Sequence, residues 1–217
     1  MQTPQGYLGK TESAVRRLFD GVDEYLAVLR RATGPVFVSG LPLGPEQDAQ
    51  LLAWQEANRE QLEAARESQR EYLAETFALD TLCGAVLQVA AKALEIYGPG
   101  TTLPDGLPPE VTARYARLCV GRTIRTLPLG IIVYAARNQH THFNDELLRE
   151  PSRSVFKRLA TAHGYGKGDT FLDPAFDLSN PLLVSFASNV TALVGWRSYE
   201  RYIDDMQDML GPFSQRT

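Results

Sequence analysis

The 217-residue sequence has few cysteines and no long apolar run. The two cysteines, Cys83 and Cys119, lie in apolar segments, where a buried free thiol is expected more often than a disulfide. No stretch approaches the roughly 18 consecutive apolar residues that a membrane span needs. Residues 1–10 lack the basic start and apolar middle of a secretory signal. We therefore expect a folded cytoplasmic protein that is neither stapled by disulfides nor associated with a membrane.

Lysine is also scarce, and the overall charge is not basic. The formal net charge is -4, and of the 22 basic residues 18 are arginine and 4 are lysine. This charge excludes a broad basic coat for nucleic acid. However, residues 111–170 carry 10 basic and 4 acidic side chains, between acidic flanks. The planar guanidinium binds phosphate at two points, so the composition does not exclude a small arginine-lined cleft that binds RNA. A GC-rich genome would give the same arginine bias.

The first half of the chain is predicted to be helical around one connector. Residues 11–31 form an amphipathic helix, with Val15, Leu18, Phe19, Val22, Leu26 and Leu29 on one stripe. Residues 34–45 are rich in glycine and proline around the apolar run 36–38, which predicts a buried connector or an isolated strand. Residues 45–97 favour one long helix, or two with a break near 68–80, polar at first and apolar later. These patterns divide the chain into residues 1–44, a helix with its connector, and residues 45–217, a helical domain. We expect the two segments to form one globular unit.

The second half is predicted to hold several shorter helices. We expect them over residues 109–126, 130–142, 151–163 and 181–210, with Pro128 interrupting the first pair and Asn180 capping the last helix. The sum is an all-α protein of about six to eight helices, with a long N-terminal helical extension.

The basic segment contains every histidine of the chain, and two of them, His140 and His142, follow Arg137 closely. Imidazole takes and gives protons near neutral pH. A neighbouring arginine can hold a phosphate and the charge that develops on it. Together they suffice to cleave RNA without a metal, by attack of the ribose 2'-hydroxyl on the adjacent phosphorus. We expect no metal or other cofactor, because the His-x-His pair has no further Cys or His cluster beside it.

Arg137, Asn138 and His142 form an Arg-Asn-x-x-x-His pattern that resembles the signature of HEPN domains, which are all-helical modules of RNA-cleaving toxins, CRISPR effector nucleases and phage-defence proteins. The resemblance covers the motif and the helical architecture of residues 70–210. It implies a metal-independent endoribonuclease that works as a homodimer with a composite site. Arg137 would stabilise the phosphate, His142 would act as general base or acid, and Asn138 would orient the imidazole or the phosphate. An antitoxin or a defence-system protein would be the partner.

Helical geometry adds one constraint to this motif. Asn138 and His142 are four residues apart and share a helix face, whereas Arg137 and His142 diverge by about 140°. One chain alone would pair the arginine and the histidine poorly. The geometry suits a site at a helix boundary or across a two-fold axis, and it also suits two unrelated residues.

Other residues have two interpretations each. His140, Arg122 and Arg125 are candidates for RNA contacts, although the arginines would equally serve as a solvated surface. Asp80 is a candidate supporting acid or a satisfied helix carboxylate. Arg158 and His163 match the looser spacing, but Leu159 between them lies on an apolar stripe, which indicates a structural helix.

Three functions are therefore consistent with the sequence. The first is a HEPN-type endoribonuclease acting on RNA in a toxin or phage-defence context. The second is a catalytically inactive HEPN-like module that binds RNA or protein. The third is an all-helical scaffold in which the motif is a coincidence.

Overall fold

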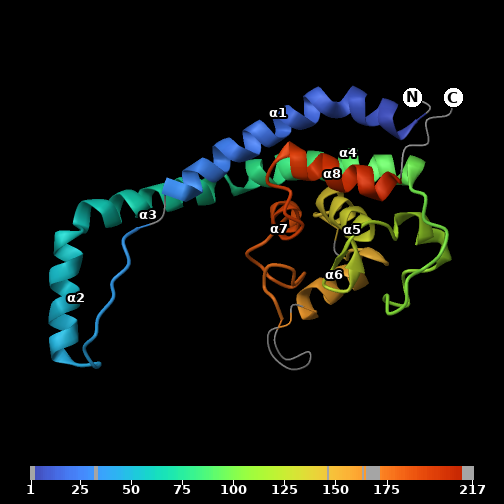
Figure 1. Cartoon of the computed structure of the whole chain (residues 1–217). Helices are drawn as coiled ribbons and strands as arrows, with labels where there is room; N and C mark the ends of the chain where they lie inside the picture. Colours follow the sequence, from blue (N-terminus) through green and yellow to red (C-terminus); the bar gives the residue numbers. More distant parts are fainter. Residues whose placement is uncertain (1–2, 32–33, 146, 163, 165–171, 212–217) are drawn as a thin grey trace. The chain divides into compact units, whose positions relative to one another are not determined.

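We describe the fold from a computed structural model, which covers residues 3–31, 34–145, 147–162, 164 and 172–211 (Figure 1). Helices make up 64% of the structure and strands 2%. Within these residues there are eight α-helices and one 3-10 helix. The predicted all-α fold is confirmed.

The chain divides into two compact units, a larger unit of residues 1–22 and 79–217 and a smaller unit of residues 23–78. Helix α1 (Pro4–Arg31) and helix α4 (Thr76–Tyr97) each contribute to both units. The sequence suggested a boundary between residues 44 and 45, which falls inside the smaller unit. The reason is that the connector after α1 packs on the helices that follow it. Gly34, for example, lies against Ala65.

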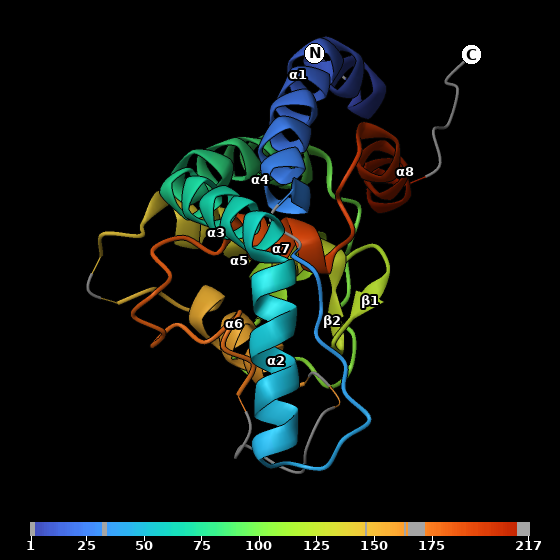
Figure 2. The same cartoon turned by 90° about the vertical axis from the view of Figure 1, so that its left-hand side faces the viewer.

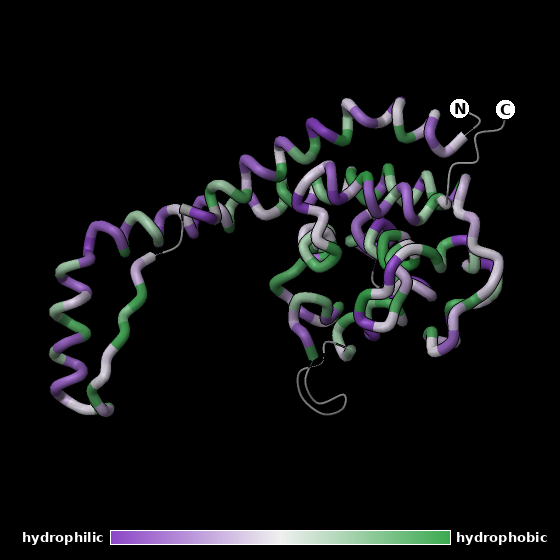
Figure 3. The backbone as a smooth tube through the Cα atoms, viewed as in Figure 1, coloured by the Kyte–Doolittle hydropathy of each residue, from purple (hydrophilic) through white to green (hydrophobic). Residues whose placement is uncertain are grey.

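The smaller unit contains helices α2 (Pro45–Ala57) and α3 (Arg59–Ala74), which break at Asn58, and α3 is followed by a second break at Glu75. The second break lies within the predicted interval of 68–80. Figure 3 shows hydrophilic residues recurring along both helices, and in the described part of the unit α2 buries no residue and α3 buries only Ala65.

The apolar run of the connector is not buried, so that prediction was wrong. Val36 and Val38 are 80% and 83% exposed. Phe37, between them, packs its ring on Trp54 with the centroids 5.5 Å apart. In an extended segment successive side chains point to opposite sides, so one apolar residue reaches the helix and its two neighbours face away.

The larger unit is built on α1 and α4. The predicted α1 stripe is confirmed at Val15, Phe19 and Val22, which are buried, and the helix begins earlier than residue 11. Among the described residues α4 is the helix long and apolar enough to cross a membrane. That is weak evidence for a membrane, because 56% of the stretch is buried in the protein and core helices of soluble proteins meet the same criterion. Cys83 and Cys119 are buried free thiols, as predicted.

The helix expected over 109–126 does not form. A 3-10 helix, η1 (Ala113–Leu118), is followed by strands β1 (Thr123–Ile124) and β2 (Leu127–Pro128), which pair antiparallel (Figure 2). Arg125 and Thr126 form the turn at φ 47° and 69°, and Gly121 also has a positive φ. A glycine, three β-branched residues and a proline within residues 121–128 favour this hairpin over a helix.

Helices α5 (Leu129–Thr141) and α6 (Ser152–Thr161) lie within one or two residues of their predicted starts and pack on each other. Leu159 is fully buried on α6, as its apolar stripe predicted, whereas His163 lies outside the described residues.

The prediction of a single helix over residues 181–210 was wrong. Asn180 caps only a turn, accepting the backbone N–H of Leu182, and two helices follow: α7 (Ala187–Leu193) and α8 (Tyr199–Leu210). Gly195, at φ 74°, turns the chain between them so that Trp196 reaches the core, where it is 1% exposed. Burial of this indole and the Ser198 N-cap of α8 favour two short helices over one long one.

Candidate functional site

The motif lies at the C-terminal end of α5, where an apolar helix becomes polar. Residues 131–136 are buried except Tyr134, and they anchor the helix in the core. The helix ends at Thr141, and the backbone N–H of His142 donates to the carbonyl of Asn138. Asn138 and His142 line one small cleft of about 290 Å³, so the prediction that they share a face is confirmed.

His142 is paired with an aspartate that the sequence motif did not include. Its Nδ1 lies 3.2 Å from Oδ2 of Asp145, and the two side chains are 56% and 50% exposed. No described residue bonds to Nε2 on the other side of the ring. A carboxylate at Nδ1 favours the tautomer that carries its hydrogen there, which leaves the Nε2 lone pair available for proton transfer.

Asn138 does not contact the imidazole. Its Nδ2 donates to Oγ of Ser152 at 3.1 Å, which ties α5 to the first residue of α6. Ser152 is 1% exposed, and it lines the same small cleft as His142. The amide therefore holds one wall of the cleft.

Arg137 points away from His142 within one chain. Its guanidinium forms an ion pair with Glu95 of α4 and lies over the Tyr134 ring, 5.4 Å from the centroid. The side chain is 19% exposed, and its Nε is buried without a partner among the described residues. Arg137 lines neither cleft that contains His142. The predicted divergence is confirmed, and a composite site across a dimer stays a prediction.

Gln139 fixes the wall opposite His142. The side chain is 6% exposed, donates from Nε2 to the Val184 carbonyl at 3.1 Å, and accepts the Phe186 backbone N–H at Oε1, 3.0 Å away. Val184 and Phe186 line the cleft. One buried amide therefore holds the segment before α7, which has no regular structure of its own.

His140, a candidate for RNA contact, is turned inward. Its Nδ1 is hydrogen-bonded to Oγ of Ser185 at 2.9 Å, and its ring lies so close to Gly84 of α4 that a Cβ there would be 2.1 Å from Nε2. Burial lowers the pKa of His140, and the carboxylate of Asp80 opposes that shift. The ring therefore packs α5 against α4, and it does not line the His142 clefts.

Asp80 is a satisfied helix carboxylate, which was the structural one of its two interpretations. It is 5% exposed and accepts the backbone N–H of Ser188 at 2.8 Å. Burial raises the pKa of Asp80, and the bonds from Ser188 oppose that shift. Asp80 supports the start of α7 and does not line the cleft.

Arg122 and Arg125, which the sequence suggested as RNA ligands or as a solvated surface, are both paired with carboxylates of the protein, and their side chains are 35% and 18% exposed. Arg122 binds both carboxylate oxygens of Asp205 at 3.0 Å, and Asp205 is 5% exposed. Arg125 forms an ion pair with Asp173 at 2.7 Å and donates to the Leu159 carbonyl at 2.6 Å. Arg122 directly precedes β1 and Arg125 lies in the turn of the hairpin, and both side chains are directed to partners within the protein.

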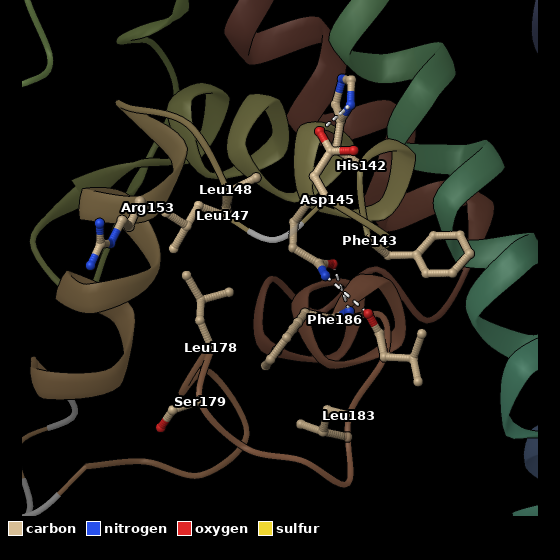
Figure 4. A pocket seen from close by; sticks show the side chains of 12 residues that line it. His142, Phe143, Asp145, Leu147, Leu148, Arg153, Leu178, Ser179, Leu183 and Phe186 are labelled. Carbon is tan, nitrogen blue, oxygen red and sulfur yellow. Dashed lines mark hydrogen bonds and ion pairs between the residues drawn. The ribbon is translucent and has the colours of Figure 1, made fainter.

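The main cleft next to His142 has a volume of about 470 Å³. Figure 4 shows His142 and Asp145 at one side and Arg153 of α6 at the other, with leucines between them. Arg149 lines the smaller cleft beside His142. Sequence reasoning missed both arginines, although their spacing of four residues was visible. The floor and walls are mostly apolar: Leu147, Leu148, Leu178, Leu183, Val184 and Phe186.

This arrangement combines a proton-transferring group, a carboxylate that orients it and two cations in adjoining clefts. Within the described residues, no group of three His, Cys, Asp or Glu side chains is placed to hold a metal ion. The imidazole, the carboxylate and the guanidinium groups are suited to acid–base catalysis and to anion binding.

Comparisons with known proteins add no assignment to this geometry. No protein-family model matches the chain, and neither a curated protein nor a solved structure matches it.

Proposed function

We propose that the protein is a metal-independent endoribonuclease whose catalytic group is His142. The observation that carries the proposal is the His142–Asp145 pair at 3.2 Å, half exposed at the edge of a cleft. Support also comes from Arg149, which shares the smaller cleft with His142. A HEPN-type relationship, a toxin or phage-defence context and a cytoplasmic location belong to the same proposal and rest on the sequence motif.

The proposed reaction needs one proton acceptor and one cation. Nε2 of His142 takes the proton of the ribose 2'-hydroxyl, and O2' then attacks the adjacent phosphorus. The bond from phosphorus to the 5'-oxygen breaks, and that oxygen leaves with a proton from solvent. The products are a 2',3'-cyclic phosphate and a 5'-hydroxyl end. General base catalysis of this kind contributes about 10²–10⁴-fold in rate.

Asp145 and Arg149 have distinct roles in this scheme. Asp145 holds the imidazole tautomer and stabilises the imidazolium that forms. Arg149 lies on the same cleft and offers the fork of donors that suits phosphate oxygens. Arg137 becomes a positioning residue that joins α5 to α4 through Glu95.

The test is incubation of the purified protein with mixed RNA in EDTA, beside His142→Ala and Asp145→Asn. Asn144→Ala is the matched control, because Asn144 is exposed on the same loop and lines neither cleft. We expect cleavage by the wild type and the control, strong loss in both site variants, and no cleavage at a 2'-deoxy position. Cleavage that survives His142→Ala, or that occurs at the 2'-deoxy position, contradicts the mechanism.

The homodimer with a composite site can be tested by complementation. If Arg137 of one chain serves His142 of the other, Arg137→Ala and His142→Ala are each inactive, and mixing them restores part of the activity. Without such a site, Arg137→Ala acts only through the packing of α5, and mixing restores nothing.

A second candidate is a non-catalytic protein-binding module. It is favoured by the apolar side chains exposed near the His142 cleft: Leu147 at 68%, Val184 at 55% and Leu182 at 86%. An antitoxin or defence-system partner would cover them. Leu182→Ser, at a residue that lines neither His142 cleft, would then weaken binding of that partner and leave any RNA cleavage unchanged.

A further inference from the structure

Helix α6 and the turn before it carry three cations at intervals of four residues, Arg149, Arg153 and Lys157. All three are exposed. The backbone N–H of Arg153 donates to the Arg149 carbonyl, so Arg149 lies one helical turn before Arg153. No ion pair links any of the three to a described residue. Arg153 and Lys157 lie one turn apart on the same face of α6, about 6 Å along its axis. Arg149 precedes the helix, on the other side of the Glu150–Pro151 peptide bond, which is cis.

The row of Arg149, Arg153 and Lys157 joins neighbouring clefts into a continuous surface. Arg149 shares a cleft with His142, and Arg153 lines the main cleft with His142. Arg153 and Lys157 then line a third cleft of about 390 Å³, and Lys157 with Arg158 lines a fourth. The first two clefts share His142, the second and third share Arg153, and the third and fourth share Lys157.

Acidic side chains border the row but do not neutralise it through contacts. Glu110, Glu150 and Asp177 also line the third cleft. The Glu150 carboxylate accepts the backbone N–H of Ser154, and the Asp177 carboxylate accepts from Ser179. The third cleft therefore holds three carboxylates beside Arg153 and Lys157, and no ion pair joins them among the described residues.

We propose that Arg149, Arg153 and Lys157 form a track for the phosphate backbone of single-stranded RNA, leading from His142 along α6. This inference rests on the proposed function. The three cations line adjoining clefts that begin at His142, and the apolar cleft between His142 and Arg153 offers leucine surface to an unstacked base. Bases in a duplex are stacked inside it and cannot enter such a cleft, so the track selects single strands.

The experiment measures binding separately from cleavage. Titrations use the His142→Ala protein and a labelled single-stranded oligouridylate at several salt concentrations. The track variant adds Arg149→Ala, Arg153→Ala and Lys157→Ala. The matched control adds Arg59→Ala, Arg66→Ala and Arg70→Ala instead, on exposed positions of α3, and changes the net charge equally.

Each phosphate contact contributes about 0.7 to the slope of log affinity against log salt for single strands. The track variant should therefore lower that slope by about 2, and reduce affinity about 100-fold at 0.1 M salt, while the control retains both. Equal losses in track variant and control, or tighter binding of a duplex than of the single strand, overturn the proposal. Equally tight binding of polyglutamate overturns it too, because the row would then suit an acidic protein.

The two proposals fail in different ways. RNA binding that is lost in the track variant, together with an inactive wild type, refutes cleavage and leaves the track intact. Wild-type cleavage that is unchanged by the three track substitutions refutes the track and leaves the nuclease intact. Arg149→Lys with Arg153→Lys should retain the slope, since charge is kept.

Discussion

Replacing Gln139 by methionine should destabilise the larger unit and loosen the cleft wall. The substitution keeps the length of the side chain and removes both of its hydrogen bonds, to the Val184 carbonyl and from the Phe186 N–H. Phe186 is 2% exposed, so its N–H loses its partner where water cannot replace it, at a cost of about 1–3 kcal/mol. Val184 is 55% exposed, so its carbonyl can turn to water at a cost of about 0.5–1 kcal/mol. We expect a total loss of about 1.5–4 kcal/mol.

The assay is urea unfolding followed by tryptophan fluorescence. The chain has two tryptophans, so a Trp54→Phe background leaves Trp196 as the sole reporter of the larger unit. Gln55→Met, on an exposed position of α2, is the matched control and should change stability little. Hydrogen exchange at the Phe186 amide should accelerate in Gln139→Met. A loss below about 0.5 kcal/mol, with unchanged exchange at Phe186, would refute the role assigned to Gln139.

Three further predictions concern the surroundings of the site. Gly84→Ala places a Cβ 2.1 Å from Nε2 of His140. The clash costs about 1–3 kcal/mol and exceeds the roughly 1 kcal/mol by which alanine stabilises a helix relative to glycine, so the urea midpoint should fall. A rise in the midpoint would contradict the packing of His140 on Gly84. Burial lowers the pKa of His140 below its ordinary 6.5, so its contribution to stability is complete above that pH and is lost as the pH falls through the folded value. The unfolding free energy should therefore drop between pH 7.5 and 5.5, and drop less in His140→Gln; equal drops would show that another group titrates. Burial raises the thiol pKa of both Cys83 and Cys119 to about 11, so iodoacetamide at pH 8 should label neither in the native protein and both in urea, as mass spectrometry can show.

The sequence was sufficient to predict α5 and the face shared by Asn138 and His142. An apolar segment that becomes abruptly polar defines both the buried part of the helix and its exposed end. The inward position of Gln139 follows from the same periodicity, since it lies four residues after Ala135 and seven after Ile132, both buried. The polar residues on both sides of Gln139 obscure this signal, and no burial was predicted for it.

The errors arose where tertiary contacts decide the local structure. The sequence of residues 109–126 does not indicate that Arg122 will form an ion pair with Asp205, which is 83 positions away, or that this ion pair stabilises a hairpin. Trp196 separates α7 from α8 because its indole is buried and its Nε1 donates to the same Asp205. Local propensity favoured helix in both places, and long-range contacts prevailed.

The candidate site was predictable only in part, because half of it comes from outside the motif. Asp145 follows the helix in a loop, where periodicity says nothing about which side chains meet. Arg149 and Arg153 lie before and within α6, and they reach the clefts only because α5 and α6 pack together. Arg137 was correctly placed on another face than His142, but its partner Glu95 could not be identified without the fold.

The most direct test of the central proposal is the rate of RNA cleavage by the wild type and by His142→Ala, measured at pH 7 in EDTA on the same oligoribonucleotide. If Nε2 of His142 takes the 2'-hydroxyl proton, the variant should be slower by about 10²–10⁴-fold, and the wild-type fragments should end in 2',3'-cyclic phosphate. Equal rates, or fragments that end in a 3'-hydroxyl, would contradict it.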